Sequence, residues 1–254
     1  MTLFDFDPQF RETAAIFRLL QLLPLRYGLA EGRIFRWFAV NIPMDLLQTS
    51  RFYGDLDLTA CLRPHKSESG SLKYLSWEVK LILIDKIGRP RSLKRGKTQD
   101  IVKQLKIHRR FGSPEPSLLE MFLCEDSPVS LKHFPSPAVF EVMRNRADAL
   151  QRGKFGYKIL PFQHGRHDDK DFGTFTVQHP FSHLQTISTI VRPMRTPASG
   201  AFLELMQVLG EFADSRKSLG FFVIVFCKDC RHLGSIRMQD DAICPNCGSF
   251  LVTQ

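Results

Sequence analysis

Hydrophobic positions along this chain of 254 residues follow two different periods. Apolar residues recur at helical spacing over 8–23 and again over about 29–38, which predicts two helices near the start of the sequence. Two longer apolar runs, 52–62 and 74–85, have the length and composition of strands. The polar connection between them, 65–71, is short enough for a hairpin, so we expect these strands to pair antiparallel.

The rest of the chain continues this mixture of helices and strands. A helix is predicted at 97–111, closed by Gly112 and Pro114, and a mixture of helix and strand at 117–148. Another helix is predicted at 198–215, with an apolar face formed by Phe202, Leu205, Met206, Leu209 and Phe212. Short apolar runs predict strands at 157–162, 173–178 and 221–226. The pattern as a whole indicates an α/β fold.

Composition and charge add a class of partner to this pattern. The hydrophobic fraction of 43% is ordinary for a globular protein, whereas the net charge of +9 favours a polyanionic partner, with nucleic acid first and an acidic membrane surface second. The apolar runs are too short to span a bilayer. Asp5 and Asp7 stand where a secretory signal would need positive charge. We therefore expect a cytoplasmic protein that does not act on membranes.

Four of the six cysteines form two Cys-x-x-Cys pairs separated by thirteen residues: Cys227, Cys230, Cys244 and Cys247. Two such pairs at this spacing bring four thiolates within tetrahedral reach of one Zn²⁺ ion and predict a zinc ribbon. Gly248 permits the tight turn after the second pair, and Gly234 is the candidate for the first. Four thiolates leave no open coordination position, so the predicted zinc is structural. The ribbon could bind nucleic acid, bind a protein, or close the C-terminus.

Acidic and basic residues interrupt the two predicted hairpin strands at informative positions. Asp55 and Asp57 are two residues apart on the first strand, and Glu78 and Lys80 are two apart on the second. Residues at this spacing point to the same face of a strand. If the two strands are neighbours, carboxylates and an ammonium group converge on one place, which suits a hard divalent cation and a water that attacks a phosphate.

These motifs resemble the PD-(D/E)xK nuclease superfamily, which has the restriction-endonuclease-like fold. The family pattern is an Asp at the end of one hairpin strand, then (Asp/Glu)-x-Lys on the next strand, then a helix. Gly54-x-x-Asp57 followed by Glu78-Val79-Lys80 has this order and spacing, although the Pro of the family name is absent. The resemblance covers about 25–115. It implies a mixed sheet flanked by helices, to which the small C-terminal zinc ribbon is added.

The resemblance also implies a mechanism. Asp57 and Glu78 would bind Mg²⁺, for which Mn²⁺ can substitute, with help from the backbone carbonyl of Val79. Lys80 would position the attacking water, and Asp55 is a possible second metal ligand. The implied activity is the hydrolysis of phosphodiester bonds in DNA by a Mg²⁺-dependent deoxyribonuclease.

The segment after the second hairpin strand supports a nucleic-acid substrate. Related branches of the family place a Gln on the next helix, and Gln99 and Gln104 are the matching candidates. The same segment carries many basic residues against the single acid Asp100. Such a surface would neutralise backbone phosphates without reading bases. The residues expected to contact nucleic acid are Arg91, Lys94, Arg95, Lys97, Lys103, Lys106, Arg109 and Arg110.

The sequence thus predicts a nuclease-like core at 1–160, a strand and helix extension at 161–222 and a zinc ribbon at 223–254. Homodimers or larger complexes are compatible with this class. The alternative is a non-catalytic protein that binds nucleic acid or assists assembly through the ribbon and the basic helix.

Overall fold

The chain is an α/β protein built on a mixed sheet. The computed structural model describes residues 15–16, 19–20, 33–47, 52–64, 72–85, 89–90, 97–124, 135–163, 188–216, 222–237 and 244–249. Eight strands form one sheet in the order β6-β5-β4-β3-β2-β1-β7-β8. The strands are β1 Arg33–Pro43, β2 Asp55–Pro64, β3 Lys73–Ile84, β4 Ser117–Cys124, β5 Gly156–Gln163, β6 Ser188–Val191, β7 Phe222–Phe226 and β8 Leu233–Arg237. The described helices are α2 Thr98–Phe111, α4 Pro137–Gly153 and α5 Gly200–Ser215.

The chain divides into two compact units, each assembled from separate stretches of sequence. The first unit holds the described residues of 78–106 and 116–194, and the second holds those of 13–77, 107–115 and 195–254. The division passes through β3, between Trp77 and Glu78. The boundaries predicted at 160 and 222 remain a prediction.

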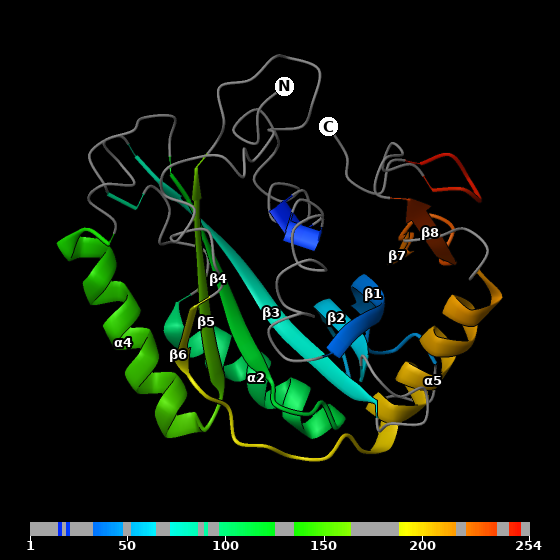
Figure 1. Cartoon of the computed structure of the whole chain (residues 1–254), viewed down its shortest axis with the longest axis horizontal. Helices are drawn as coiled ribbons and strands as arrows, with labels where there is room; N and C mark the ends of the chain where they lie inside the picture. Colours follow the sequence, from blue (N-terminus) through cyan, green and yellow to red (C-terminus); the bar gives the residue numbers. More distant parts are fainter. Residues whose placement is uncertain are drawn as a thin grey trace. The chain divides into compact units, whose positions relative to one another are not determined.

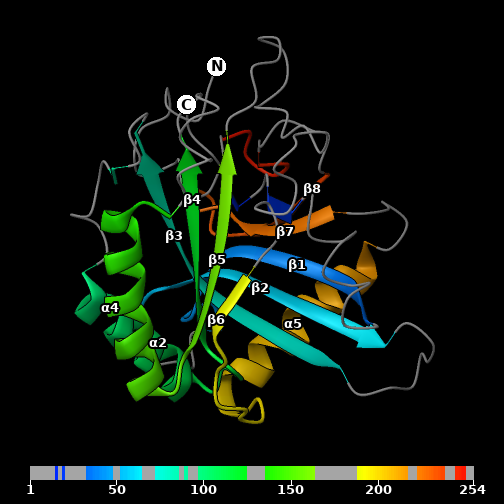
Figure 2. The same ribbon diagram turned by 60° about the vertical axis from the view of Figure 1, so that its left-hand side comes forward.

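The first unit packs helices against the strands that follow Trp77. β4 and β5 run parallel, with Leu118 opposite Tyr157, and Figure 2 shows β4 between β3 and β5. The core contains apolar residues of both helices and all three strands, namely Ile82, Ile84, Ile101, Leu105, Leu118, Phe122, Val139, Met143, Leu150, Phe155, Tyr157 and Ile159. Alternate positions of β3 and β4 supply this core because side chains two apart share one face of a strand.

The second unit is organised around β1. This strand pairs antiparallel with β2 and parallel with β7, and β7 in turn pairs antiparallel with β8. The helix α5 lies beside β1 (Figure 1). It presents the apolar face expected from the sequence, since Phe202, Leu205, Met206 and Leu209 are buried and Phe212 is half-buried. The core therefore joins α5 to the strands on either side of β1.

Most predicted elements are confirmed, and one is wrong. The hairpin of β2 and β3 is antiparallel, with Leu58 paired to Trp77, and α2, β5, α5 and β7 lie within a few residues of their expected bounds. The region 117–148 resolves into β4 and the start of α4. The helix predicted at 29–38 is instead the strand β1. Phe38, Ala39 and Val40 are all buried, so this central strand has an uninterrupted apolar run without alternation.

Two further predictions fall partly or wholly outside the described residues. Of the helix expected at 8–23, the described positions Ala15, Ile16, Leu19 and Leu20 are helical and buried. The strand expected at 173–178 lies outside the described residues. No helix in the described part of the chain is both long and apolar enough to cross a membrane.

Candidate metal sites

The four cysteines predicted to bind zinc form a cluster in the second unit. All four Sγ atoms lie within 4.8 Å of one another. Cys227 Sγ is 3.7 Å from Cys247 Sγ, and Cys230 Sγ is 3.7 Å from Cys244 Sγ. A tetrahedral Zn²⁺ with Zn–S bonds of about 2.3 Å separates its sulfur ligands by roughly 3.8 Å. The cluster could therefore hold a metal ion such as zinc with all four ligands supplied by protein.

Two backbone turns of the same design position the four thiols. In the first turn, Arg231 N–H donates to the carbonyl of Cys227 at 2.9 Å, and in the second, Gly248 N–H donates to that of Cys244 at 2.9 Å. Arg231 has φ 58° and Gly248 has φ 76°. The turn therefore needs a left-handed residue directly after its second cysteine, where glycine adopts this conformation at low cost and arginine does not.

The prediction that Gly234 serves the first turn is wrong. Gly234 lies within β8, and a Cβ atom there would come within 3.1 Å of Pro245 Cδ. The glycine is needed because the second turn packs closely on the strand. The sequence gives no signal for Arg231, since the left-handed position it occupies is normally marked by glycine or asparagine.

Hydrogen bonds and burial set unequal acidities for the thiols in the metal-free chain. The Asn246 side chain contributes most to lowering the pKa of Cys230 to about 6, and Ser249 lowers that of Cys247. Burial raises the pKa of Cys227 to about 12. A bound cation would favour the thiolate form at each position. Asn246 and Ser249 were not singled out from the sequence, although polar residues beside metal-binding cysteines often orient them.

The first cysteine turn is continuous with the sheet. Phe226 ends β7 and Cys227 follows directly. Lys228, inside this turn, places its Nζ 3.4 Å from Asp55 Oδ2 at the start of β2. A bound metal would thus hold the turn that links the end of β7 to the start of β2.

Glu78 and Lys80 form the second candidate site, and the structure brings them together as expected. The Glu78 side chain is 2% exposed, and Lys80 Nζ lies 2.8 Å from Glu78 Oε1. The same ammonium donates to the backbone carbonyl of Val79 at 2.8 Å. A buried carboxylate and a backbone carbonyl therefore share one cation on β3, within the first unit. Both are oxygen donors of the kind preferred by Mg²⁺.

Asp55 and Asp57 lie on β2 in the second unit. Both are half-buried, whereas Leu56 and Leu58 between and after them are buried, so the two aspartates share the less buried face. Asp55 is paired with Lys228. Asp57 directly precedes Leu58, whose partner across the hairpin is Trp77, the residue before Glu78.

The residues of α2 that were expected to act in catalysis or to contact nucleic acid differ in how exposed they are. Gln99 and Gln104 are exposed. The buried face of the helix is formed by other residues, including Ile101, Leu105 and His108. Among the basic residues, Lys97, Lys103, Lys106 and Arg110 are exposed. Arg109 is half-buried, and burial lowers its pKa. Arg91, Lys94 and Arg95 lie outside the described residues.

A buried charge cluster in the first unit was missed by the sequence analysis. Arg146 of α4 and Tyr157 of β5 both donate hydrogen bonds to the carboxylate of Glu120 on β4. Burial, partly offset by Arg146, raises the pKa of Glu120. Its signal in the sequence is one acidic residue within the apolar run Ser117–Cys124. The cluster lines no described cavity, so we assign it to the stability of the unit.

Comparisons of the chain with models of known protein families, with curated proteins and with solved structures find no match.

Proposed function

We propose that the chain is a metal-dependent nuclease that hydrolyses phosphodiester bonds in DNA. The observation that carries this proposal is the contact of Lys80 Nζ with both Glu78 Oε1 and the Val79 carbonyl. The three consecutive residues supply a carboxylate, a carbonyl and an ammonium group at one point of an ordered strand. This is the donor set expected from the resemblance to PD-(D/E)xK nucleases, whose restriction-endonuclease-like fold is part of the proposal.

The order of the elements supports the same reading. The Asp-bearing strand β2, the Glu-x-Lys strand β3 and the helix α2 follow one another along the chain. The hairpin register pairs Leu58 with Trp77 within the second unit. We assign Asp57 as the second metal-binding carboxylate because the Gly54-x-x-Asp57 spacing is the one that resembles the family pattern. Asp55, which is paired with Lys228, is the weaker candidate.

In the proposed mechanism each residue has one task. Asp57, Glu78 and the Val79 carbonyl would hold Mg²⁺, which lowers the pKa of a bound water and offsets charge on the scissile phosphate. Burial fixes the Glu78 carboxylate, because a 2% exposed side chain has little room to reorient. Lys80 holds its ammonium group beside Glu78 and can donate a hydrogen bond to the attacking water. The exposed cations Lys97, Lys103, Lys106 and Arg110 would contact backbone phosphates.

Cleavage of plasmid and single-stranded DNA with Mg²⁺, Mn²⁺ or EDTA tests the proposal. The variants are Asp57→Asn, Glu78→Gln and Lys80→Met, which remove charge at nearly constant volume. We expect each to lower the cleavage rate at least about 100-fold, by analogy with the loss of one group that stabilises a transition state. Glu141→Gln is the matched control, because it removes one carboxylate charge from an exposed position of α4.

Two results would count against the nuclease. Cleavage by all three variants at the wild-type rate would place any active site elsewhere. A wild-type protein that binds DNA in a gel-shift assay but cuts nothing with either metal would favour the alternative, a non-catalytic nucleic-acid-binding or assembly protein. A metal ion held by the cysteine cluster would be structural in either case, since four thiolate ligands leave no open position.

A further inference from the structure

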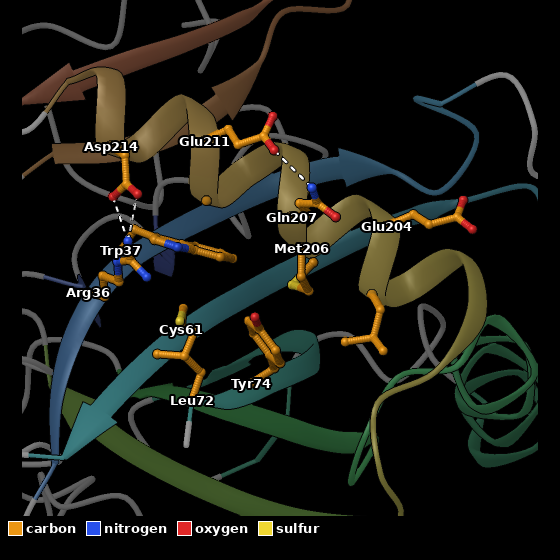
Figure 3. Close-up of a pocket in the computed structure, with 12 residues that line it drawn as sticks. Arg36, Trp37, Cys61, Leu72, Tyr74, Glu204, Met206, Gln207, Glu211 and Asp214 are labelled. Atoms are coloured by element: carbon orange, nitrogen blue, oxygen red, sulfur yellow. Dashed lines mark hydrogen bonds and ion pairs between the residues drawn. The ribbon is translucent and has the colours of Figure 1, made fainter. Parts of the chain in front are cut away.

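A groove of about 510 Å³ lies in the second unit, between α5 and the strands β1, β2 and β3 (Figure 3). Its floor contains Trp37, Cys61, Tyr74 and Met206. The rings of Trp37 and Tyr74 are 6.5 Å apart between centroids. Two exposed leucines also line the groove, Leu72 at 39% and Leu203 at 41% exposure. Trp37 is 2% exposed and Tyr74 is half-buried, so the groove combines a largely buried aromatic floor with accessible apolar walls.

The rim of the groove is acidic although the whole chain carries a net charge of +9. Its charged lining consists of three carboxylates and one guanidinium group, on Glu204, Glu211, Asp214 and Arg36. Asp214 holds Arg36 through two contacts of 2.7 Å. Gln207 donates to Glu211 Oε1 at 3.0 Å and orients that carboxylate (Figure 3). After Asp214 and Arg36 neutralise each other, the two glutamates leave the rim negative.

Gly210 lies inside α5 and also lines the groove. Glycine within a helix costs about 1 kcal/mol relative to alanine. Neither backbone nor packing explains it here, because the helix continues through the position and a Cβ atom would meet only Trp37 Nε1, at 4.0 Å. What glycine does provide is space in the groove at its own position, which is half-buried. The chain therefore carries a less stable helix and keeps this part of the groove open.

We propose that the groove binds a short basic segment of a partner protein. Arginine or lysine side chains of that segment pair with Glu204 and Glu211, and one of them lies beside the half-buried ring of Tyr74. These cations gain the ion pairs, and the one beside Tyr74 also gains attraction to its ring. Apolar residues beside it in the partner pack on Leu72 and Leu203. The negative rim repels phosphate, so this site is distinct from any nucleic-acid surface and independent of the nuclease proposal.

The test uses two synthetic heptapeptides, Ac-Gly-Leu-Arg-Gly-Leu-Arg-Gly-NH₂ and its analogue with citrulline at both arginine positions. Citrulline keeps the shape and removes the charge. Titration into the full-length protein is followed by NMR at the Trp37 indole N–H and the Gly210 amide. We expect saturable shifts with the arginine peptide and at least tenfold weaker binding of the citrulline analogue. No saturable shift at millimolar peptide, or equal binding of both peptides, would overturn the proposal.

Variants locate the binding within the groove. The double variant Glu204→Gln/Glu211→Gln keeps the surface polar and is expected to weaken the arginine peptide at least fivefold. Gly210→Leu should block it by filling the groove beside α5, and Gly210→Ala should raise the melting temperature while weakening binding less. Glu141→Gln on α4 removes the same kind of charge outside the groove and should bind as the wild type does. Unchanged affinity in the double variant would show that the peptide binds elsewhere.

Discussion

Glu120 places a carboxyl group in the core of the first unit. Its side chain is fully buried, and Arg146 and Tyr157 both donate to it. Charges removed from water are tolerated only when they are paired and hydrogen-bonded, and losing one partner leaves the other unpaired in a dry environment. The three residues therefore stabilise the unit only as a complete set.

Arg146→Met is expected to lower the free energy of unfolding by about 3–5 kcal/mol at neutral pH. It removes the group that offsets the raised pKa of Glu120, so that pKa rises further. A carboxyl group with a raised folded pKa favours the fold when protonated, and this contribution is lost as pH rises through the folded pKa. The gap between variant and wild type should therefore shrink as pH falls from 7.5 towards about 4.5, as measured by urea unfolding.

A second variant controls for packing. Glu120→Gln combined with Arg146→Met removes both charges and should be more stable than Arg146→Met alone at pH 7.5. A gap that is independent of pH would show that the lost volume of Arg146, and not the stranded carboxylate, causes the destabilisation.

Cys61 should be chemically inert in the folded protein. Burial raises the pKa of its thiol to about 12, despite the opposing charge of Arg36, and the residue is 1% exposed. The thiolate is the reactive form. Iodoacetamide at pH 8 should leave Cys61 unmodified in the native protein and label it fully in denaturant, as measured by peptide mass spectrometry. Rapid labelling without denaturant would mean that the floor of the groove opens readily.

The helices α4 and α5 both have a serine at the N-cap, which allows the contribution of the cap hydrogen bond to stability to be tested. Ser136 Oγ accepts a hydrogen bond from Val139 N–H at 3.3 Å at the start of α4, whereas Ser199, the N-cap of α5, makes no such bond. Ser136→Ala should lower the free energy of unfolding by about 1 kcal/mol. Ser199→Ala should change it by less than about 0.5 kcal/mol. Equal losses in chemical denaturation would contradict this assignment of the caps.

Elements with a clear period were predictable, and the central strand was not. α2 and α5 show one apolar face each, and β2 and β3 are separated by a short polar connection. β1 is covered on both sides and paired at both edges. Its apolar residues are therefore consecutive, and in a short stretch this pattern does not separate a buried strand from a helix.

Zinc should affect the second unit as a whole, because Cys227 directly follows the paired strand β7. We expect one zinc per chain by metal analysis and none in Cys247→Ser. That variant should melt roughly 5 °C lower or more, since 1 kcal/mol corresponds to about 2–4 °C for a chain of this size. Cys61→Ala should keep its zinc, because Cys61 lies outside the cluster. Full zinc content in Cys247→Ser would contradict a site with four thiolate ligands.

At the scale of the molecule, the sequence predicts local motifs better than it predicts contacts between residues that are far apart in the chain. The spacing of Cys227, Cys230, Cys244 and Cys247 was enough to predict their convergence. The contact between Glu78 and Lys80 followed from the pleat of one strand. The acidic groove was not predictable, because Trp37, Tyr74 and Glu204 come from elements whose packing no local pattern specifies. The same holds for Glu120 and Arg146, which meet across β4 and α4.

The parallel pairing of β1 with β7 has a consequence for the nascent chain. Phe38 is paired with Val223, so β1 and its partner on that edge leave the ribosome far apart in time. β2 can cover one edge of β1 almost at once. The other edge is apolar and keeps unpaired backbone groups until β7 is made, and such an edge recruits strands from other chains. Chains truncated before Phe222 should therefore aggregate during expression even though most of the sheet is already encoded.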